Sequence, residues 1–257
     1  MIVQIYEIQS PEEAEACISI GVDHLGSVLL SQSEWRQPAI RDVVRLTEET
    51  KVRSSIIPLF QDEETISRAI DYYRPHILHF CDSLTDRQAA LLDWKEIVAL
   101  QESLKRRFPQ IRIMRTIPIP PHGVAPDFPF LTLADALEDA TDLFLVDTWL
   151  GSEPVEGFVG ITGRPADWNR SRELVRKSRI PVILAGGLSP ENVYDALLQV
   201  NPYGADSCTH TNALDHDQRP VRFKKDFQKV RKFVQEVRRA EKAATKSRQE
   251  DTRTPGR

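Results

Sequence analysis

Strand-like and helix-like segments alternate along almost the whole chain of 257 residues. The strand-like runs cover residues 3–8, 24–30, 53–60, 76–81, 111–117, 142–147, 181–185 and 204–208. Each is followed by a longer stretch with helical periodicity, and the first such stretch opens with Ser10 and Pro11, a common start of a helix. Regular alternation of this kind predicts a parallel sheet covered by helices.

The number of these units limits the fold further. Eight strand-helix units within about 240 residues match the closed (β/α)8 barrel, or TIM barrel. We therefore expect one barrel over residues 1–240. The alternative is a doubly wound open sheet, but no G-x-G-x-x-G follows the first strand, which disfavours a dinucleotide-binding version. Residues 241–257 lack apolar periodicity, so we expect a basic C-terminal extension that is disordered.

Composition excludes several classes of protein. Hydrophobic residues make up 40% and charged residues 28%, as is ordinary for a globular domain, and a net charge of −4 gives no basis for binding nucleic acid or a membrane surface. No apolar run approaches the roughly 20 residues of a membrane span, and the N-terminus does not resemble a signal peptide. Cys17, Cys81 and Cys208 are widely spaced, which suits a reducing compartment and forms no zinc motif. We expect a cytoplasmic monomer or homodimer.

Glycines and hydroxyl residues follow the last three strands. The stretch "ILAGGLSPEN" places Gly186 and Gly187 between an apolar strand and a helix start. Glycine lets backbone N–H groups approach an anion, and the helix dipole favours negative charge there. Because phosphate sites in these barrels commonly follow strands seven and eight, the pattern predicts a phosphate cradle. The alternative is that the glycines only form a tight turn.

Several of these segments resemble one enzyme family. "PVILAGGLSPENVYDALLQVNPYGAD", "GITGRPADW", "LVDT" and "SPEEAEACISIGVDHLGSVLL" are similar to segments of phosphoribosylanthranilate isomerase, a barrel enzyme of tryptophan biosynthesis. The resemblance extends over residues 1–240. It is strongest over residues 181–206, fair over 142–168 and weak over 52–130.

The resemblance implies an isomerase, formally an intramolecular oxidoreductase, that needs no metal or organic cofactor. The family carries out an Amadori rearrangement, which converts an N-linked phosphoribosyl amine, a phosphorylated sugar, into a 1-amino-1-deoxyribulose phosphate. Asp147 would be the general acid. Arg36 would face the substrate's carboxylate, which suits a guanidinium group, and Arg115 at the fifth strand is a second substrate-binding candidate. The phosphate cradle would consist of Gly160, Thr162, Gly163, Gly186, Gly187, Cys208, Thr209 and His210.

The chain departs from the family at the catalytic base. The family begins K-[IV]-C-G, with the cysteine as base, whereas this chain has Gln4, Ile5, Tyr6 and Glu7 at those positions. A tyrosine, whose pKa is normally about 10, is a poor base at neutral pH. Glu7 has a better pKa, but neighbouring strand residues point to opposite faces, so it should point away if Tyr6 points in. His79 at the end of the fourth strand has a suitable pKa. Glu7 and His79 remain candidate substitute bases.

Other departures affect the ends of strands four and eight. The family's Q-L-H-G appears here as residues 79–82, His-Phe-Cys-Asp, and its S-S-G appears as residues 208–210, Cys-Thr-His. Two alternatives to an isomerase therefore stay open. One is a diverged barrel that binds a phosphosugar with another activity or none, and the other is a non-catalytic scaffold protein. The retained Asp147 and glycine loops favour the isomerase or the phosphosugar binder, and the missing cysteine favours the two alternatives.

Overall fold

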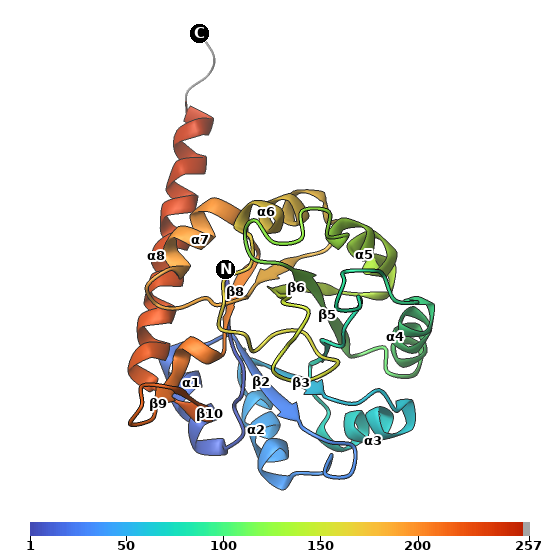
Figure 1. The fold of residues 1–257 in the computed structure, drawn as a ribbon. Coiled ribbons are helices and arrows are strands. Elements are labelled where there is room, and N and C mark those ends of the chain that lie inside the picture. Colours follow the sequence, from blue (N-terminus) through green and yellow to red (C-terminus); the bar gives the residue numbers. More distant parts are fainter. Residues whose placement is uncertain (254–257) are drawn as a thin grey trace.

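The computed structural model describes the backbone of residues 1–253 and the side chains of residues 1–246. Its eight parallel strands form a closed barrel in sequence order (Figure 1). The strands are β1 (Ile2–Ile5), β2 (His24–Leu29), β3 (Arg53–Pro58), β4 (Ile77–Phe80), β5 (Arg112–Ile119), β6 (Leu143–Thr148), β7 (Val182–Leu184) and β8 (Gly204–Ser207). Because β1 pairs with both β2 and β8, the sheet is closed, and the (β/α)8 barrel is confirmed over the open sheet.

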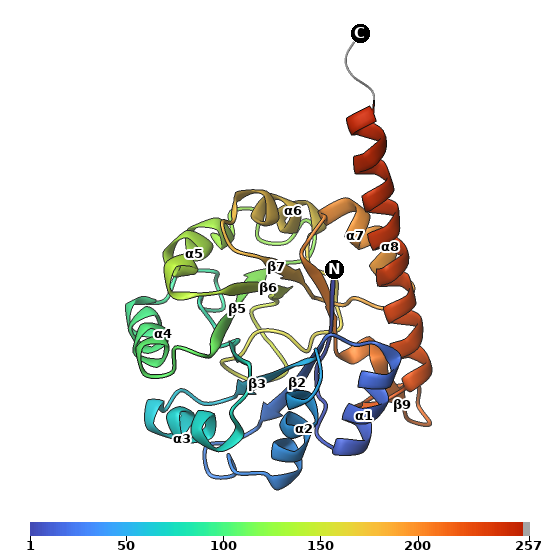
Figure 2. The ribbon, with the colours of Figure 1, turned by 180° about the vertical axis from the view of Figure 1, so that it is seen from behind.

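The helices surround the barrel, as the views from both sides show (Figures 1 and 2). They are α1 (Pro11–Ile20), α2 (Pro38–Glu48), α3 (Glu63–Tyr73), α4 (Lys95–Arg107), α5 (Phe130–Leu137), α6 (Trp168–Lys177), α7 (Val193–Val200) and α8 (Phe227–Arg253), with short 3-10 turns at Glu138–Ala140 and Thr209–Thr211. The capping signals work as expected: the Ser10 hydroxyl accepts a hydrogen bond from the Glu13 amide at the start of α1. Within residues 1–253, no helix has the length and apolar character needed to cross a membrane.

The segment between β4 and α4 is less helical than its sequence indicates. Helical periodicity is present from Asp86 onward, yet α4 begins only at Lys95. The Asp86 carboxylate accepts hydrogen bonds from the amides of Gln88 and Ala90, at 2.8 and 2.9 Å. Such local bonds give the backbone an alternative to the helix, so the chain turns here.

The C-terminal region also differs from expectation. Residues 223–225, expected to be helical, belong to β10 (Pro220–Lys225), which pairs with β9 (Asn212–Leu214) as an antiparallel hairpin. The disordered extension expected from residue 241 is wrong for residues 241–253, because α8 continues through them and projects past the barrel (Figure 1). Residues 254–257 lie outside the described residues.

Two apolar layers hold the barrel together. One lies inside the sheet, where Met114, Leu145 and Ile183 pack with their neighbours. The other is larger and lies between the sheet and the helices, including Phe144 from β6 and Phe233 from α8. Strand residues alternate between these layers, so the inward positions near the carboxyl ends are the ones available to a site.

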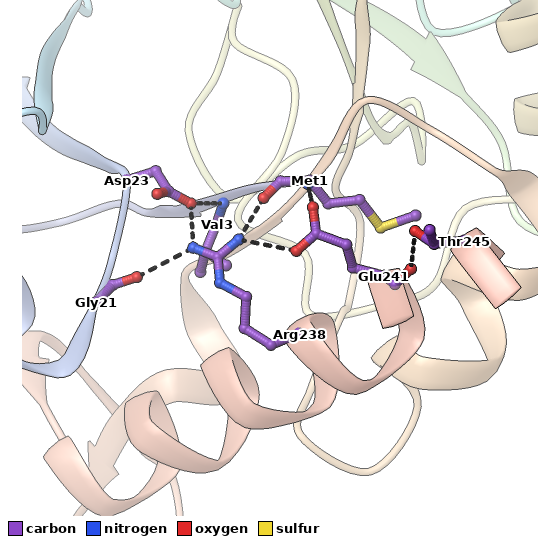
Figure 3. A network of polar contacts seen from close by, with 7 residues as sticks. All are labelled: Met1, Val3, Gly21, Asp23, Arg238, Glu241 and Thr245. Carbon is purple, nitrogen blue, oxygen red and sulfur yellow. Dashed lines mark hydrogen bonds and ion pairs between the residues drawn. The ribbon is translucent and has the colours of Figure 1, made fainter. Parts of the chain in front are cut away.

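Arg238 on α8 fastens the first strand to the rest of the barrel (Figure 3). Its guanidinium donates to the Met1 carbonyl at 2.5 Å and to Asp23 Oδ2 at 2.6 Å. The same carboxylate oxygen accepts from the Val3 amide at 2.7 Å, and Glu241 pairs with the N-terminal amino group. The last helix therefore holds β1 in the position where it closes the sheet.

We expect Arg238→Met to lower the free energy of unfolding by about 1–2 kcal/mol, because hydrogen bonds to charged groups contribute about 1.5–3 kcal/mol and this side chain is partly exposed. Urea denaturation measures the change. Arg45→Met on α2 is the control, since Arg45 and Asp42 form an exposed ion pair at 3.5 Å worth at most about 1 kcal/mol. Equal effects of the two substitutions would contradict the role given to Arg238.

Candidate active site at the mouth of the barrel

A small cavity of about 60 Å³ lies at the carboxyl ends of the strands. Inward side chains of the barrel form its floor, and Phe158, Val159 and Ile161 from the loop after β6 border it as well. A space of this size holds a few water molecules and is too small for a phosphorylated sugar. A substrate of that class can therefore enter only when the loop that contains residues 158–161 moves away.

Asp147 on β6 borders this cavity. The pKa of its carboxyl group is raised to about 6, mainly by burial. The Thr148 amide, which donates to the carboxylate at 2.7 Å, acts against this shift, and Glu153 adds to it. Gly160 lies directly against the carboxylate, because a Cβ atom there would be 2.3 Å from Oδ2. Asp147 therefore stands at the mouth with a pKa suited to proton transfer near neutral pH.

Tyr6 points into the barrel, where it contacts residues of β2, β3 and β4. The phenol oxygen is 2.6 Å from Ser55 Oγ and 2.7 Å from His79 Nδ1. Gly26 makes room for the ring, since a Cβ atom there would come within 2.0 Å of it. Burial raises the pKa of Tyr6 well above its usual value, so the phenol stays protonated and is unsuited to act as a base.

His79 is part of the same hydrogen-bonded row. Its second ring nitrogen, Nε2, is 2.8 Å from Thr116 Oγ1, so both nitrogens have partners. Burial, with a smaller effect from Arg115, lowers the pKa of His79 to about 3. The imidazole is therefore neutral and structural in this arrangement, which argues against its use as the base.

Glu7 is turned toward the β9–β10 hairpin. Its carboxylate accepts hydrogen bonds from Arg222 Nε at 2.6 Å and from Asn212 Nδ2 at 3.1 Å. Burial favours a higher pKa, but Arg222 and Asn212 outweigh it and lower the pKa of Glu7. Its φ of 65° is a left-handed conformation that glycine adopts most easily. Glu7 thus stands on a glycine-like turn, with its carboxylate bound by Arg222 and Asn212.

Asp206 on β8 is a site residue that the sequence reasoning missed. The residue is 6% exposed and lies beside Gln4 in the sheet register, and its carboxyl group accepts a hydrogen bond from Gln4 Nε2 at 3.1 Å. The pKa of Asp206 is raised to about 8, mainly by burial. The hydrogen bond from Gln4 acts against this shift, nearby Asp147 adds to it, and Lys225 acts against it. The available signal was an acidic residue at an inward position of the last strand, within the segment that most resembles the family.

Seven of the eight proposed cradle residues, all except Gly160, come together around a second cavity of about 30 Å³. Asp147 and Asp206 border it too, together with the cradle residues Thr162, Gly163, Gly186, Gly187, Cys208, Thr209 and His210. His210 Nε2 donates to the Gly163 carbonyl at 2.9 Å and so joins the loops after β6 and β8. Because this space holds about one water molecule, a phosphate group needs these loops to separate.

Gly186 and Gly187 form a tight turn, which was one of the two roles that the sequence allowed. Both residues have positive φ, 78° at Gly186 and 58° at Gly187. A Cβ atom on Gly187 would lie 2.5 Å from the carbonyl carbon of Arg164, and one on Gly186 would lie 2.4 Å from Thr148 Oγ1. The loop after β6 and the end of β6 pack directly against these two glycines. The same glycines therefore form both the tight turn after β7 and one wall of the cradle.

The structure does not bring the two candidate arginines to the mouth. The Arg36 guanidinium lies 4.7 Å from the centre of the Tyr72 ring, on the outer surface. Arg115 is fully buried on the outer side of β5, where it binds Asp82 at 2.6 and 3.1 Å. Its position one residue away from the inward Thr116 explains the difference. No arginine or lysine is among the described residues that border the mouth cavity.

One group of described residues has metal-ligand spacing: Asp215, His216 and Asp217, whose ligand atoms lie within 4.8 Å of one another. They form the turn of the β9–β10 hairpin, and His216 and Asp217 are exposed. Exposed acidic turns of this kind are common without a metal, so the group carries no functional assignment.

Comparison with known proteins gives a consistent result. The profile of the family described as N-(5'-phosphoribosyl)anthranilate (PRA) isomerase matches residues 112–212. The N-(5'-phosphoribosyl)anthranilate isomerase of Methanosarcina acetivorans is 27% identical over 241 residues, which are 92% of each chain. The enzyme of that name from Methanocella arvoryzae is 29% identical over 92% of this chain and 97% of its own.

Solved structures agree on the fold. Phosphoribosyl anthranilate isomerase from Thermotoga maritima superposes with a TM-score of 0.67 at 20% identity, covering 93% of this chain and 99% of that one. At such low identity the likeness shows the barrel alone.

We expect Gly187→Ala to destabilise the protein by about 1–3 kcal/mol, because a side chain there combines a strained backbone with a clash against Arg164. The control is Gly157→Ala, at a φ of 83° where a Cβ atom has no neighbour within 4 Å. It carries the backbone strain without the clash. Thermal or urea unfolding measures both, and an equal cost would show that the close contact contributes nothing.

The raised pKa of Asp206 predicts a pH-dependent stability. The unfolded chain releases this proton near pH 4, whereas the folded chain holds it up to about pH 8. The stabilisation is therefore complete below about pH 4 and is lost as the pH rises toward 8. We expect Asp206→Asn to gain stability relative to the wild type between pH 5 and pH 8, by about 1 kcal/mol or more. A difference that stays constant across this range would refute the buried, protonated state.

Proposed function

The chain belongs to the phosphoribosylanthranilate isomerase family, and we propose that it catalyses the Amadori rearrangement of an N-linked phosphoribosyl amine to a 1-amino-1-deoxyribulose phosphate. One observation carries the proposal: Asp147 borders both the mouth cavity and the cradle formed by the loops after β6, β7 and β8. The two parts that such a substrate needs, an anion-binding end and a proton-transferring group, therefore adjoin each other.

Each part has a defined task in the reaction. Backbone N–H groups of the glycine-rich loops would bind the phosphate, which fixes the sugar and removes much of the entropic barrier to reaction. Asp147 would then exchange a proton with the sugar, since its pKa of about 6 lets both protonation states occur near neutral pH. A solved relative supports a ligand of this class: a phosphoribosyl anthranilate isomerase, at 19% identity and a TM-score of 0.66, binds reduced 1-(o-carboxyphenylamino)-1-deoxyribulose 5-phosphate.

The comparisons favour the isomerase over the two alternatives from the sequence. The three cysteines are free, which suits the cytoplasm, and we place the reaction there. All residues used in the proposal come from one chain, so it holds for a monomer or a homodimer.

The test is turnover of phosphoribosylanthranilate by the purified full chain, followed by chromatography of the product. We expect measurable turnover in the wild type, and a loss of about 10² to 10⁴ in kcat/KM for Asp147→Asn. Asp142→Asn is the matched control: Asp142 precedes the opposite end of the same strand and binds the Ile113 amide at 2.7 Å, away from the mouth. An inactive wild type that is folded would refute the proposed activity.

A further inference from the structure

Three polar side chains form a row across the inside of the barrel. The sheet register places Gln4 of β1 opposite His24 of β2 on one side and opposite Asp206 of β8 on the other. Gln4 Oε1 is 3.0 Å from His24 Nδ1, and Gln4 Nε2 is 3.1 Å from Asp206 Oδ1. All three residues are buried. The row ends at Asp206, which borders both the mouth cavity and the cradle.

The direction of these hydrogen bonds is fixed by chemistry. The Gln4 amide nitrogen can only donate, so it faces the carboxyl oxygen, and its carbonyl oxygen must accept from His24. His24 therefore carries a hydrogen on Nδ1, and burial lowers its pKa to about 4, which keeps the ring neutral. The row therefore gives Asp206 one hydrogen-bond donor, Gln4 Nε2, and no positive charge.

The second oxygen of Asp206 is available to a ligand. Within the described part of the chain, Gln4 is the hydrogen-bond partner found for this carboxyl group, and it binds Oδ1. The charged or titratable groups around it are Asp147 from β6, Tyr6 from β1, Cys208 after β8 and Lys225 from β10. Lys225 Nζ donates to the Cys208 carbonyl and the Asn212 side chain, so its charge is shared with other acceptors.

We propose that Asp206 is the second catalytic carboxyl group of this site, partner to Asp147, and that Gln4 and His24 are the positioning residues that hold it. The inference rests on the proposed function. It also supplies a proton-transferring group in place of the missing cysteine. Hydrogen-bond partners occupy the polar atoms of Tyr6, His79 and Glu7, whereas Gln4 binds only Oδ1 of Asp206 and Oδ2 stays available.

In the proposed scheme Asp206 starts protonated and Asp147 ionised, because the pKa of Asp206 is raised further than that of Asp147. In the first step Asp206 gives this proton to the ring oxygen. The bond from C1 to that oxygen breaks, its electron pair stays on oxygen, and the nitrogen lone pair forms the C=N bond. Asp147 then takes the C2 proton, and the electrons of that C–H bond form an enolamine and neutralise the nitrogen.

The remaining step restores both groups. C1 takes a proton from Asp147 while the C2 hydroxyl gives its proton to Asp206, which leaves the ketone. Atoms and electrons balance without an oxidant or other co-reactant. The scheme gives Asp206 the acid's role and Asp147 the base's role, which reverses what the family resemblance implies for Asp147.

The first test is Asp206→Asn, which keeps an oxygen for Gln4 to bind. We expect kcat/KM for phosphoribosylanthranilate to fall by about 10² to 10⁴. Asp167→Asn is the matched control: Asp167 is also 6% exposed, caps α6 and borders neither the mouth cavity nor the cradle cavity. It should cost stability and leave turnover near that of the wild type.

The second test separates positioning from structure through the pH profile. Gln4→Lys places an ammonium group beside Asp206, so the basic limb of kcat/KM should move down by about 1 pH unit or more. If this variant does not fold, Gln4→Met is used instead. It removes a bond that lowers the pKa of Asp206, so the same limb should move up.

The outcomes distinguish the two proposals. An active wild type with an equally active Asp206→Asn variant overturns the role of Asp206 and leaves the proposed function standing. A basic limb that does not move in either Gln4 variant overturns the positioning by Gln4. A folded wild type without turnover overturns the proposed function and this inference together.

Discussion

Closure of the sheet between β1 and β8 is the constraint on which the rest of this structure depends. A closed barrel leaves no strand edge unpaired, and the register of closure decides which inward side chains become neighbours. Here it sets Gln4 beside Asp206, two residues separated by most of the chain. Arg238 stabilises that closure from the outside by binding the first residue of the chain and Asp23. The site at the mouth and the fastening at the other end therefore depend on the same strand.

Polar groups inside the barrel are of two kinds: some have all their hydrogen bonds satisfied and stabilise the core, and others are carboxyl groups with raised pKa values. Tyr6 and His79 have a hydrogen-bond partner for each of their polar atoms, so they form a rigid row that fills the barrel. Asp206 is buried and Asp147 half-buried, neither forms an ion pair with a described residue, and desolvation raises the pKa of both carboxyl groups. The family's usual base position has thus become part of the core, while two carboxyl groups keep the capacity to move protons.

The loops that close the site are held by short contacts. His210 binds the Gly163 carbonyl, and the turn at Gly187 packs against the backbone of Arg164. These contacts leave little free volume at the mouth and in the cradle, so the proposed binding of a phosphorylated sugar requires the loops to separate. Binding energy from the phosphate end can drive such a change, since it is available before the chemical step begins.

The sequence by itself determined the architecture and indicated part of the candidate site. Periodicity and capping residues fixed eight strand-helix units, and the ends of strands six to eight indicated Asp147 and the cradle, because these signals are local. Other features depended on contacts between distant segments. Whether Arg115 faces the helices, whether Glu7 meets Arg222, and whether α8 continues past residue 241 are decided by neighbours that no local pattern specifies. The pairing of Asp206 with Gln4 is the clearest case, since only the register of the closed barrel places a carboxyl group from the last strand beside an amide from the first.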